Sequence, residues 1–193
     1  MSSGTSQVGR ATVQYPGGLA ARYRWGGTGT GDSVFGMSEG GGTLLDHGPL
    51  AAAAPERACR AELRIEGPLG TWTARFASPV FDEPEGVLWD VPGLLVVKYG
   101  FRAYALDSRT GELRWSLGSS TPLVTVVASS RLDHVIVQTE LETIAVDAGG
   151  ETVWRIAHSD VVTSAELVGG RLVLSSWSGM SQAIDPRSGH ATG

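Results

Sequence analysis

The side chains that could carry out chemistry in this sequence are histidines, carboxylates, serines and a single cysteine. Zinc sites place their ligands at short, regular spacings along the chain. The four histidines are scattered instead, at His47, His134, His158 and His190. This spacing predicts no metal site. Any one histidine would need partners from elsewhere in the fold before it could act as an acid or a base.

Two glycine-rich tracts, at 26–31 and 40–42, are the next candidates, because glycine-rich loops can cradle phosphates. Neither tract ends in the Gly-Lys-Ser/Thr sequence of a phosphate loop. Ser33, Ser38 and Ser178 also lack the nucleophile-elbow pattern of a hydrolase. An enzyme of the hydrolase type, with a site near Asp46 and His47 in this glycine-rich half, remains the alternative to a non-enzymatic protein.

Composition and charge narrow the compartment and the partners. The net charge of −5 predicts no surface for nucleic acid. Cys59 is the only cysteine, so no intramolecular disulfide can form, which fits a reducing compartment. The N-terminus lacks a secretory signal, and no run approaches the roughly 20 apolar residues of a membrane span. We therefore expect a cytoplasmic protein of a bacterial kind, with no membrane partner.

The strongest pattern is a repeated phrase. AYALDSRTGELRW ends at Trp115, AVDAGGETVW ends at Trp154, and a third copy begins at Ala183 and breaks off near Gly189. An aspartate at the end of a strand can accept hydrogen bonds from the turn that follows. Glycine supplies a positive φ in that turn, and tryptophan can bury a large flat ring against a neighbouring sheet. These residues thus predict turns and packing, with no reaction chemistry.

The elements around the phrase are short apolar strands, and the period is about 40 residues from Asp107 to Asp147 and on to Asp185. Each unit holds about four strands, which is the size of one propeller blade. The sequence predicts an all-β fold, a small or incomplete β-propeller of four-stranded antiparallel blades. We divide it into blades at 58–193 and a glycine-rich segment at 1–57. That segment could supply the first strands, at 12–15 and 21–25, and a short helix at 51–59.

The phrase at Ala105–Trp115 resembles the tryptophan-docking motif, Ala-x-Asp-x-x-Thr-Gly-x-x-x-Trp, of pyrroloquinoline-quinone (PQQ)-like β-propeller repeats. The resemblance covers a little over half of the chain. The second copy departs by one deletion, and the third would place its tryptophan at Gly193. Such propellers serve quinone enzymes, outer-membrane assembly scaffolds and many uncharacterised proteins, so the resemblance implies architecture and no activity. Nothing matches the calcium and catalytic aspartate of the quinone enzymes, and we expect no cofactor.

The function expected from these features is a non-enzymatic interaction or scaffold module, such as an immunity protein or a subunit of a larger complex. Three blades do not close a ring, so exposed sheet edges could pair with a protein partner or with a copy of the chain. Turn tips on a rigid β scaffold are common recognition sites. The partner-binding candidates are the large apolar side chains at these tips, Tyr99, Phe101, Trp177 and Met180. The same residues could instead pack against a following blade.

Overall fold

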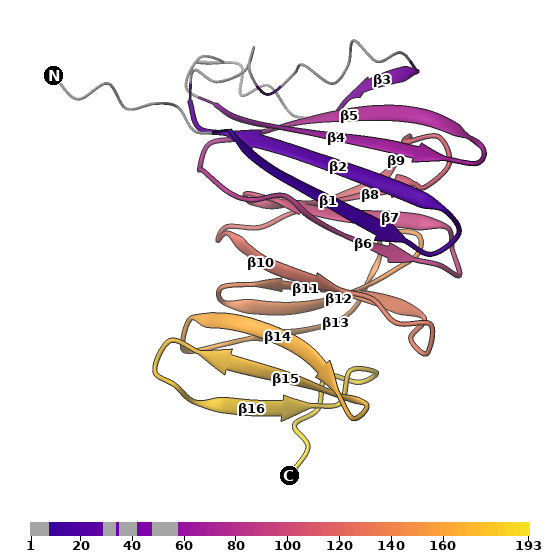
Figure 1. Ribbon diagram of the computed structural model, residues 1–193. Coiled ribbons are helices and arrows are strands. Elements are labelled where there is room, and N and C mark those ends of the chain that lie inside the picture. The colour runs from indigo at the N-terminus through magenta and orange to yellow at the C-terminus, as the bar shows by residue number, and fades with distance from the viewer. Residues whose placement is uncertain (1–7, 29–33, 35–41, 48–57) are drawn as a thin grey trace, which may run out of the picture. The chain divides into compact units, whose positions relative to one another are not determined.

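The computed structural model describes residues 8–28, 34, 42–47 and 58–193. The chain forms two compact units, Met1–Pro84 with Asp107–Leu113, and Glu85–Leu106 with Arg114–Gly193. The elements with described bounds in these units are strands, which are labelled in Figure 1. Residues 48–57 lie outside the described part, and so does most of the expected helix at 51–59. Its last residue, Cys59, begins a strand.

Unit 1 holds one sheet with the strand order β1-β2-β4-β5-β3. Neighbouring strands are antiparallel except β3, which pairs in parallel with β5. Alternation places Ala21, Tyr23 and Trp25 of β2 in the core and turns the intervening residues outward. The strands are β1 (Gly9–Tyr15), β2 (Leu19–Gly26), β3 (Thr43–Asp46), β4 (Cys59–Gly67) and β5 (Gly70–Ser78).

Unit 2 carries three antiparallel sheets that follow one another in chain order (Figure 1). The first is β6 (Glu85–Trp89), β7 (Leu94–Tyr99), β8 (Arg102–Asp107) and β9 (Leu113–Gly118). The second is β10 (Leu123–Val127), β11 (His134–Thr139), β12 (Glu142–Asp147) and β13 (Thr152–Ala157). The third is β14 (Val162–Val168), β15 (Arg171–Ser176) and β16 (Ser181–Ile184). The predicted all-β fold is confirmed, and two of the sheets have the predicted four antiparallel strands.

The sheets of unit 2 pack face to face through their apolar strands. Every residue of β7 and of β11 is buried, as expected of strands covered on both faces. One core cluster unites Leu94 and Val96 of β7 with Val135 and Val137 of β11. A second joins Ile136 of β11 to the third sheet. A single blade has two apolar faces, so burial requires this stacking.

Backbone hydrogen bonds at one end of the strands repeat from sheet to sheet. The amide of Leu123, at the start of β10, donates to Gly100 O in the β7–β8 turn at 2.9 Å. One repeat later Val162 N donates to Glu140 O in the β11–β12 turn at 2.8 Å. Each linker between sheets thus satisfies its backbone groups on the turn of the preceding sheet. A second repeated bond runs from a turn to the linker before its own sheet, since Glu140 N donates to Pro122 O at 3.1 Å and Trp177 N donates to Val161 O at 2.8 Å.

Candidate functional site

The three repeated aspartates cap the turns that follow them. Asp107 Oδ1 accepts from the amides of Arg109 and Thr110 at 2.9 and 3.1 Å. Asp147 Oδ1 and Asp185 Oδ1 accept in the same way from amides of their own turns. The glycine closing each turn has a positive φ, which is 77° at Gly111, 92° at Gly150 and 75° at Gly189. The predicted capping role is confirmed, because these carboxylates accept hydrogen bonds from the amides of their turns.

The repeated tryptophans lie on the turns of the next sheet. The Trp115 ring lies against Gly150, where an added Cβ would come within 2.8 Å of it, and its Nε1 donates to Ala148 O at 3.1 Å. The Trp154 ring lies against Gly189 in the same manner. Both residues occupy the third position of an outer strand, β9 and β13. Their equivalent surroundings confirm that they are packing residues.

A third docking contact, in unit 1, was missed from the sequence. Trp72 of β5 lies against Gly111 and donates from Nε1 to Ser108 O at 3.1 Å. The spacing could not reveal it, because no Asp-Gly phrase precedes Trp72 in its own hairpin. His47 lies against the same turn, with Nε2 donating to Gly111 O at 2.8 Å. Since a carbonyl can only accept, this nitrogen is held as a donor.

The histidine on β11 also has a structural role. His134 is buried, and its Nε2 donates to Pro186 O at 2.6 Å. Its ring meets the edge of the Trp154 ring at 84°. Trp154 Nε1 finds no hydrogen-bond partner among the described residues. His134 therefore donates its hydrogen bond to the same turn on which Trp154 packs. Within the described residues, no group of three histidine, cysteine or carboxylate side chains could hold a metal ion.

The four residues expected at exposed turn tips divide into two kinds. Tyr99 is 1% exposed, so the expectation that its side chain is available at the surface was wrong. It is the last residue of β7, a strand buried throughout its length. Phe101 is half-buried, and its carbonyl accepts from the Ser119 amide. Trp177 and Met180 are exposed at 81% and 72%.

Trp177 and Met180 lie in a turn that is longer than its equivalents. Two residues separate β7 from β8, and two separate β11 from β12, whereas the four residues from Trp177 to Met180 separate β15 from β16. The first two sheets of unit 2 form with the shorter turn, so the extra residues between β15 and β16 are not needed to form the third sheet. Of the six tryptophans in the chain, Trp177 alone is exposed. This longer turn is the most distinctive surface in the described part of the chain.

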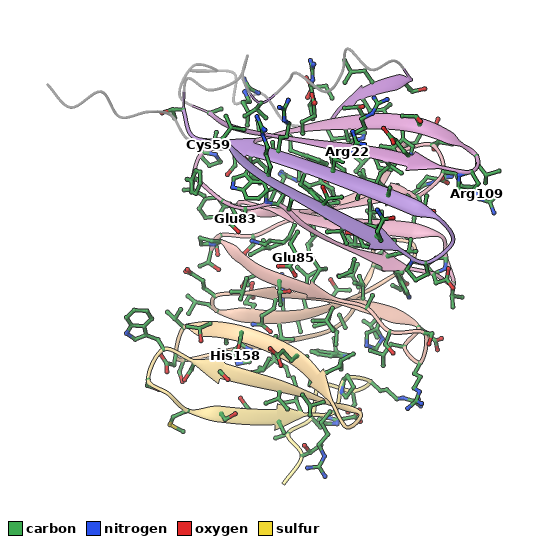
Figure 2. All side chains as sticks on the ribbon, viewed as in Figure 1. Arg22, Cys59, Glu83, Glu85, Arg109 and His158 are labelled. Atoms are coloured by element: carbon green, nitrogen blue, oxygen red, sulfur yellow. The ribbon has the colours of Figure 1, made fainter. Side chains whose placement is uncertain are left out.

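A cavity of about 390 Å³ adjoins this turn, a size within the usual range for ligand pockets. The linker between β13 and β14 and the start of β14 supply one wall, and β15, β16 and their turn supply the rest. Figure 2 labels His158, which lies beside β14. The lining is polar on the side of the turn and apolar at Val162, Leu174 and Met180. The polar lining residues are His158, Ser159, Asp160, Ser175, Ser176, Ser178, Ser181 and Gln182.

Asp160 holds the tip of the longer turn. Its Oδ2 accepts from the Ser178 hydroxyl at 2.5 Å and from the Ser178 amide at 3.2 Å, while Oδ1 accepts from Val161 N at 2.8 Å. The Ser178 and Ser176 hydroxyls, in that order, are the main causes that lower the pKa of Asp160 to about 2. Hydrogen bonds to a carboxylate favour its charged form. Asp160 is therefore ionised throughout the physiological range.

We expect that Ser178→Ala will raise the pKa of Asp160 toward its ordinary value of 3.8, because the largest cause of the shift is removed. A depressed carboxylate pKa stabilises the fold above the unfolded value, and this contribution is lost as the pH falls through about 2. Because the folded-state pKa of the variant lies closer to the unfolded value, this contribution should be smaller in the variant throughout the neutral pH range. NMR titration of the Asp160 side-chain carboxyl carbon measures this change in pKa. An unchanged midpoint would contradict the role given to the Ser178 hydroxyl.

The His158 ring is fixed by a chain of hydrogen bonds. Gln138 Nε2 donates to the carbonyls of Thr139 and Glu142 at 2.8 and 3.0 Å, which makes its Oε1 the acceptor for the Thr143 hydroxyl at 2.6 Å. Thr143 Oγ1 must then accept from His158 Nε2, which lies 2.7 Å away. Burial lowers the pKa of His158, and Glu142 opposes this shift. The neutral ring thus presents Nδ1 as an acceptor.

Sequence reasoning found Trp177 and Met180 but missed Asp160 and His158. A partial signal was present, because the third repeat is rich in serine. The hydrogen bonds of Asp160 and His158 join the β13–β14 linker to a turn and to a strand far away in the sequence, which no local pattern reveals. Among the described residues, no helix is long and apolar enough to cross a membrane.

Comparison with known proteins bears on the fold. No family model matches this sequence, and no curated protein matches it. Among solved structures, the dihydro-heme d1 dehydrogenase NirN, in complex with DHE, superposes with a TM-score of 0.55 at 16% identity. The match covers 72% of this chain and 34% of NirN, which is a β-propeller protein. The fold is that of a small or incomplete β-propeller.

Two further propellers give lower scores. BBS1N in complex with ARL6DN has a TM-score of 0.46 at 16% identity, covering 68% of this chain and 49% of its own. The N-terminal domain of Nup159 has a TM-score of 0.42 at 18% identity, covering 52% of this chain and 30% of its own. At these identities the likeness concerns architecture alone, and this chain spans about a third to a half of the structures it matches.

Proposed function

We propose that this chain is a non-enzymatic protein-interaction module, built from PQQ-like propeller repeats, that binds a protein partner through the turn between β15 and β16. The partner surface is Trp177 and Met180 with the adjoining cavity. Exposure of Trp177, in a turn lengthened beyond its equivalents, is the observation that carries the proposal. Tryptophan is enriched among the residues that dominate binding energy in protein interfaces.

The structural roles of the other repeated residues support a non-enzymatic protein. The repeated aspartates cap turns, and the repeated tryptophans pack on glycines. His47 and His134 hold backbone carbonyls. The net charge of −5 favours a protein over a nucleic acid as partner. We place the module in the cytoplasm, as a scaffold, an immunity protein or a subunit of a larger complex. Phe101 remains a candidate contact.

Replacing Trp177 with alanine should weaken partner binding at least tenfold, because truncation of an exposed interface tryptophan commonly removes a dominant contact. The folded chain would be fixed to a resin and exposed to host extract, and bound proteins would be compared by quantitative mass spectrometry. Met180→Ala should reduce the same bound protein. Val91→Ala is the matched control, because Val91 is an exposed apolar residue, at 78%, on the β6–β7 turn.

The outcomes separate the proposal from its alternatives. A protein lost with Trp177→Ala and retained with Val91→Ala supports the proposal. Light scattering of the free chain identifies a second copy as the partner if self-association also depends on Trp177. Equal capture by all three variants overturns the proposed surface.

A further inference from the structure

The cavity beside the β15–β16 turn contains a formal charge that no cation balances. Among the described residues that line it, Asp160 is the only acidic one, and none is an arginine or a lysine. The hydrogen bonds to the Asp160 carboxylate come from neutral donors, the amides and hydroxyls of the turn. The described lining therefore carries one negative formal charge, that of Asp160.

The other polar groups of this cavity are rich in acceptors. Neutral His158 offers Nδ1, because Nε2 is committed to Thr143. Gln182 adds an amide oxygen, and five serines contribute hydroxyl groups. Guanidinium presents five N–H donors and no acceptor, and it cannot lose its charge at ordinary pH. This donor-rich cation complements both the charge and the hydrogen-bonding character of the lining.

The apolar part of the lining fits the rest of an arginine side chain. Val162 and Leu174 are buried core residues at the cavity, and Met180 is exposed beside it. Arginine buries its three methylene groups along apolar surface while its head meets polar groups. Methionine adapts its shape to such a stem. A lysine would satisfy the charge but would leave more of the acceptors unpaired, since its ammonium has three donors.

We infer that this cavity binds an arginine side chain that the protein partner inserts beside Trp177, with Asp160 as the counter-ion and His158 Nδ1 as an acceptor. The inference rests on the proposed function, because it names the chemistry of the partner at that same surface. It makes the partner's arginine a specificity determinant, since the site would reject a neutral side chain that leaves Asp160 uncompensated.

The test compares two peptides on the wild-type chain. Acetyl-Gly-Arg-Gly-amide and the same peptide with citrulline in place of arginine differ by one charge and hardly in shape. The arginine peptide should bind at least tenfold more tightly in NMR titrations. Its largest shifts should fall on the amides of Asp160, Ser178 and Gln182. Equal affinity for the two peptides, or shifts confined to other residues, would overturn the inference.

Variants of the carboxylate then separate charge from turn geometry. Asp160→Asn should reduce the preference for arginine over citrulline to within twofold, and Asp160→Glu should retain it. Ser178→Ala keeps the charge while removing a hydrogen bond of the turn, so it should also retain the preference. If Asp160→Asn alters the turn, the comparison of the two peptides on the wild-type chain still decides the question.

The failure of this inference is distinguishable from that of the proposed function. Partner capture that requires Trp177, combined with no preference for the arginine peptide, overturns the arginine site alone. A clear arginine preference at Asp160, with partner capture that is indifferent to Trp177, overturns the partner surface instead.

Discussion

Replacing Trp72 with alanine will lower the free energy of unfolding by about 3–5 kcal/mol, the range for truncating a buried tryptophan. Trp72 is 1% exposed, so its ring is wholly within the core of unit 1. The substitution removes the contact with Gly111 and leaves a cavity. It also removes the donor to Ser108 O. Urea denaturation, with hydrogen exchange at β4 and β5, measures the loss.

Two other tryptophan variants serve as controls. Trp177→Ala should change the free energy of unfolding by no more than about 0.5 kcal/mol, because its side chain is exposed. Trp72→Phe keeps an aromatic ring but cannot donate to Ser108 O, and it should cost less than Trp72→Ala. Similar losses from Trp72→Ala and Trp177→Ala would show that the docking contact does not stabilise unit 1.

Replacing Gly189 with alanine will destabilise unit 2 by about 2–4 kcal/mol through strain and overpacking together. Its φ is 75°, a region that L-residues with a side chain seldom occupy. An added Cβ would lie 2.7 Å from Cε3 of Trp154 and 3.2 Å from Cδ1 of Ile156. The Trp154 ring would have to move off the turn. Chemical denaturation followed by tryptophan fluorescence measures the effect.

Gly170→Ala in the same sheet separates the two causes. Gly170 has a φ of 79°, close to that of Gly189, but an added Cβ would meet nothing within 4 Å. This control carries only the conformational strain, about 1–2 kcal/mol. The difference between the two variants is therefore the contribution of the tryptophan contact. Equal losses would mean that Trp154 accommodates a methyl group freely and that the contact is loose.

The fold could be predicted from the sequence because the features that specify each strand and turn lie close together in the chain. A strand's alternation, an aspartate beside its turn and a glycine at positive φ all act within a few residues. The phrases ending at Trp115 and Trp154 therefore predicted the blades and their turns correctly. The docking of Trp72 was hidden, because no Asp-Gly phrase precedes Trp72 in its own hairpin to mark it as a copy of the repeat.

Only part of the candidate site could be predicted from the sequence. Trp177 and Met180 stood out because large apolar residues are unexpected at a turn tip. Tyr99 met the same rule but is buried, because it is the last residue of a strand rather than part of the turn. A one-residue difference in where a strand ends decides whether such a residue is buried in the strand or exposed in the turn. Strand ends are the part of a fold that is hardest to predict from sequence.

The sequence by itself determined the blade architecture and the capped turns, because both depend on residues close together in the chain. It also determined the packing role of the repeated tryptophans, because the phrase that contains them repeats. The tertiary structure alone decided which tip residues are exposed and which polar groups share a cavity. His158, in the β13–β14 linker, is held by Thr143 of β12, and Asp160 of the same linker is held by Ser178 of the β15–β16 turn. Charge and hydrogen bonding act through space, so a cavity's chemistry exists only once the sheets have stacked.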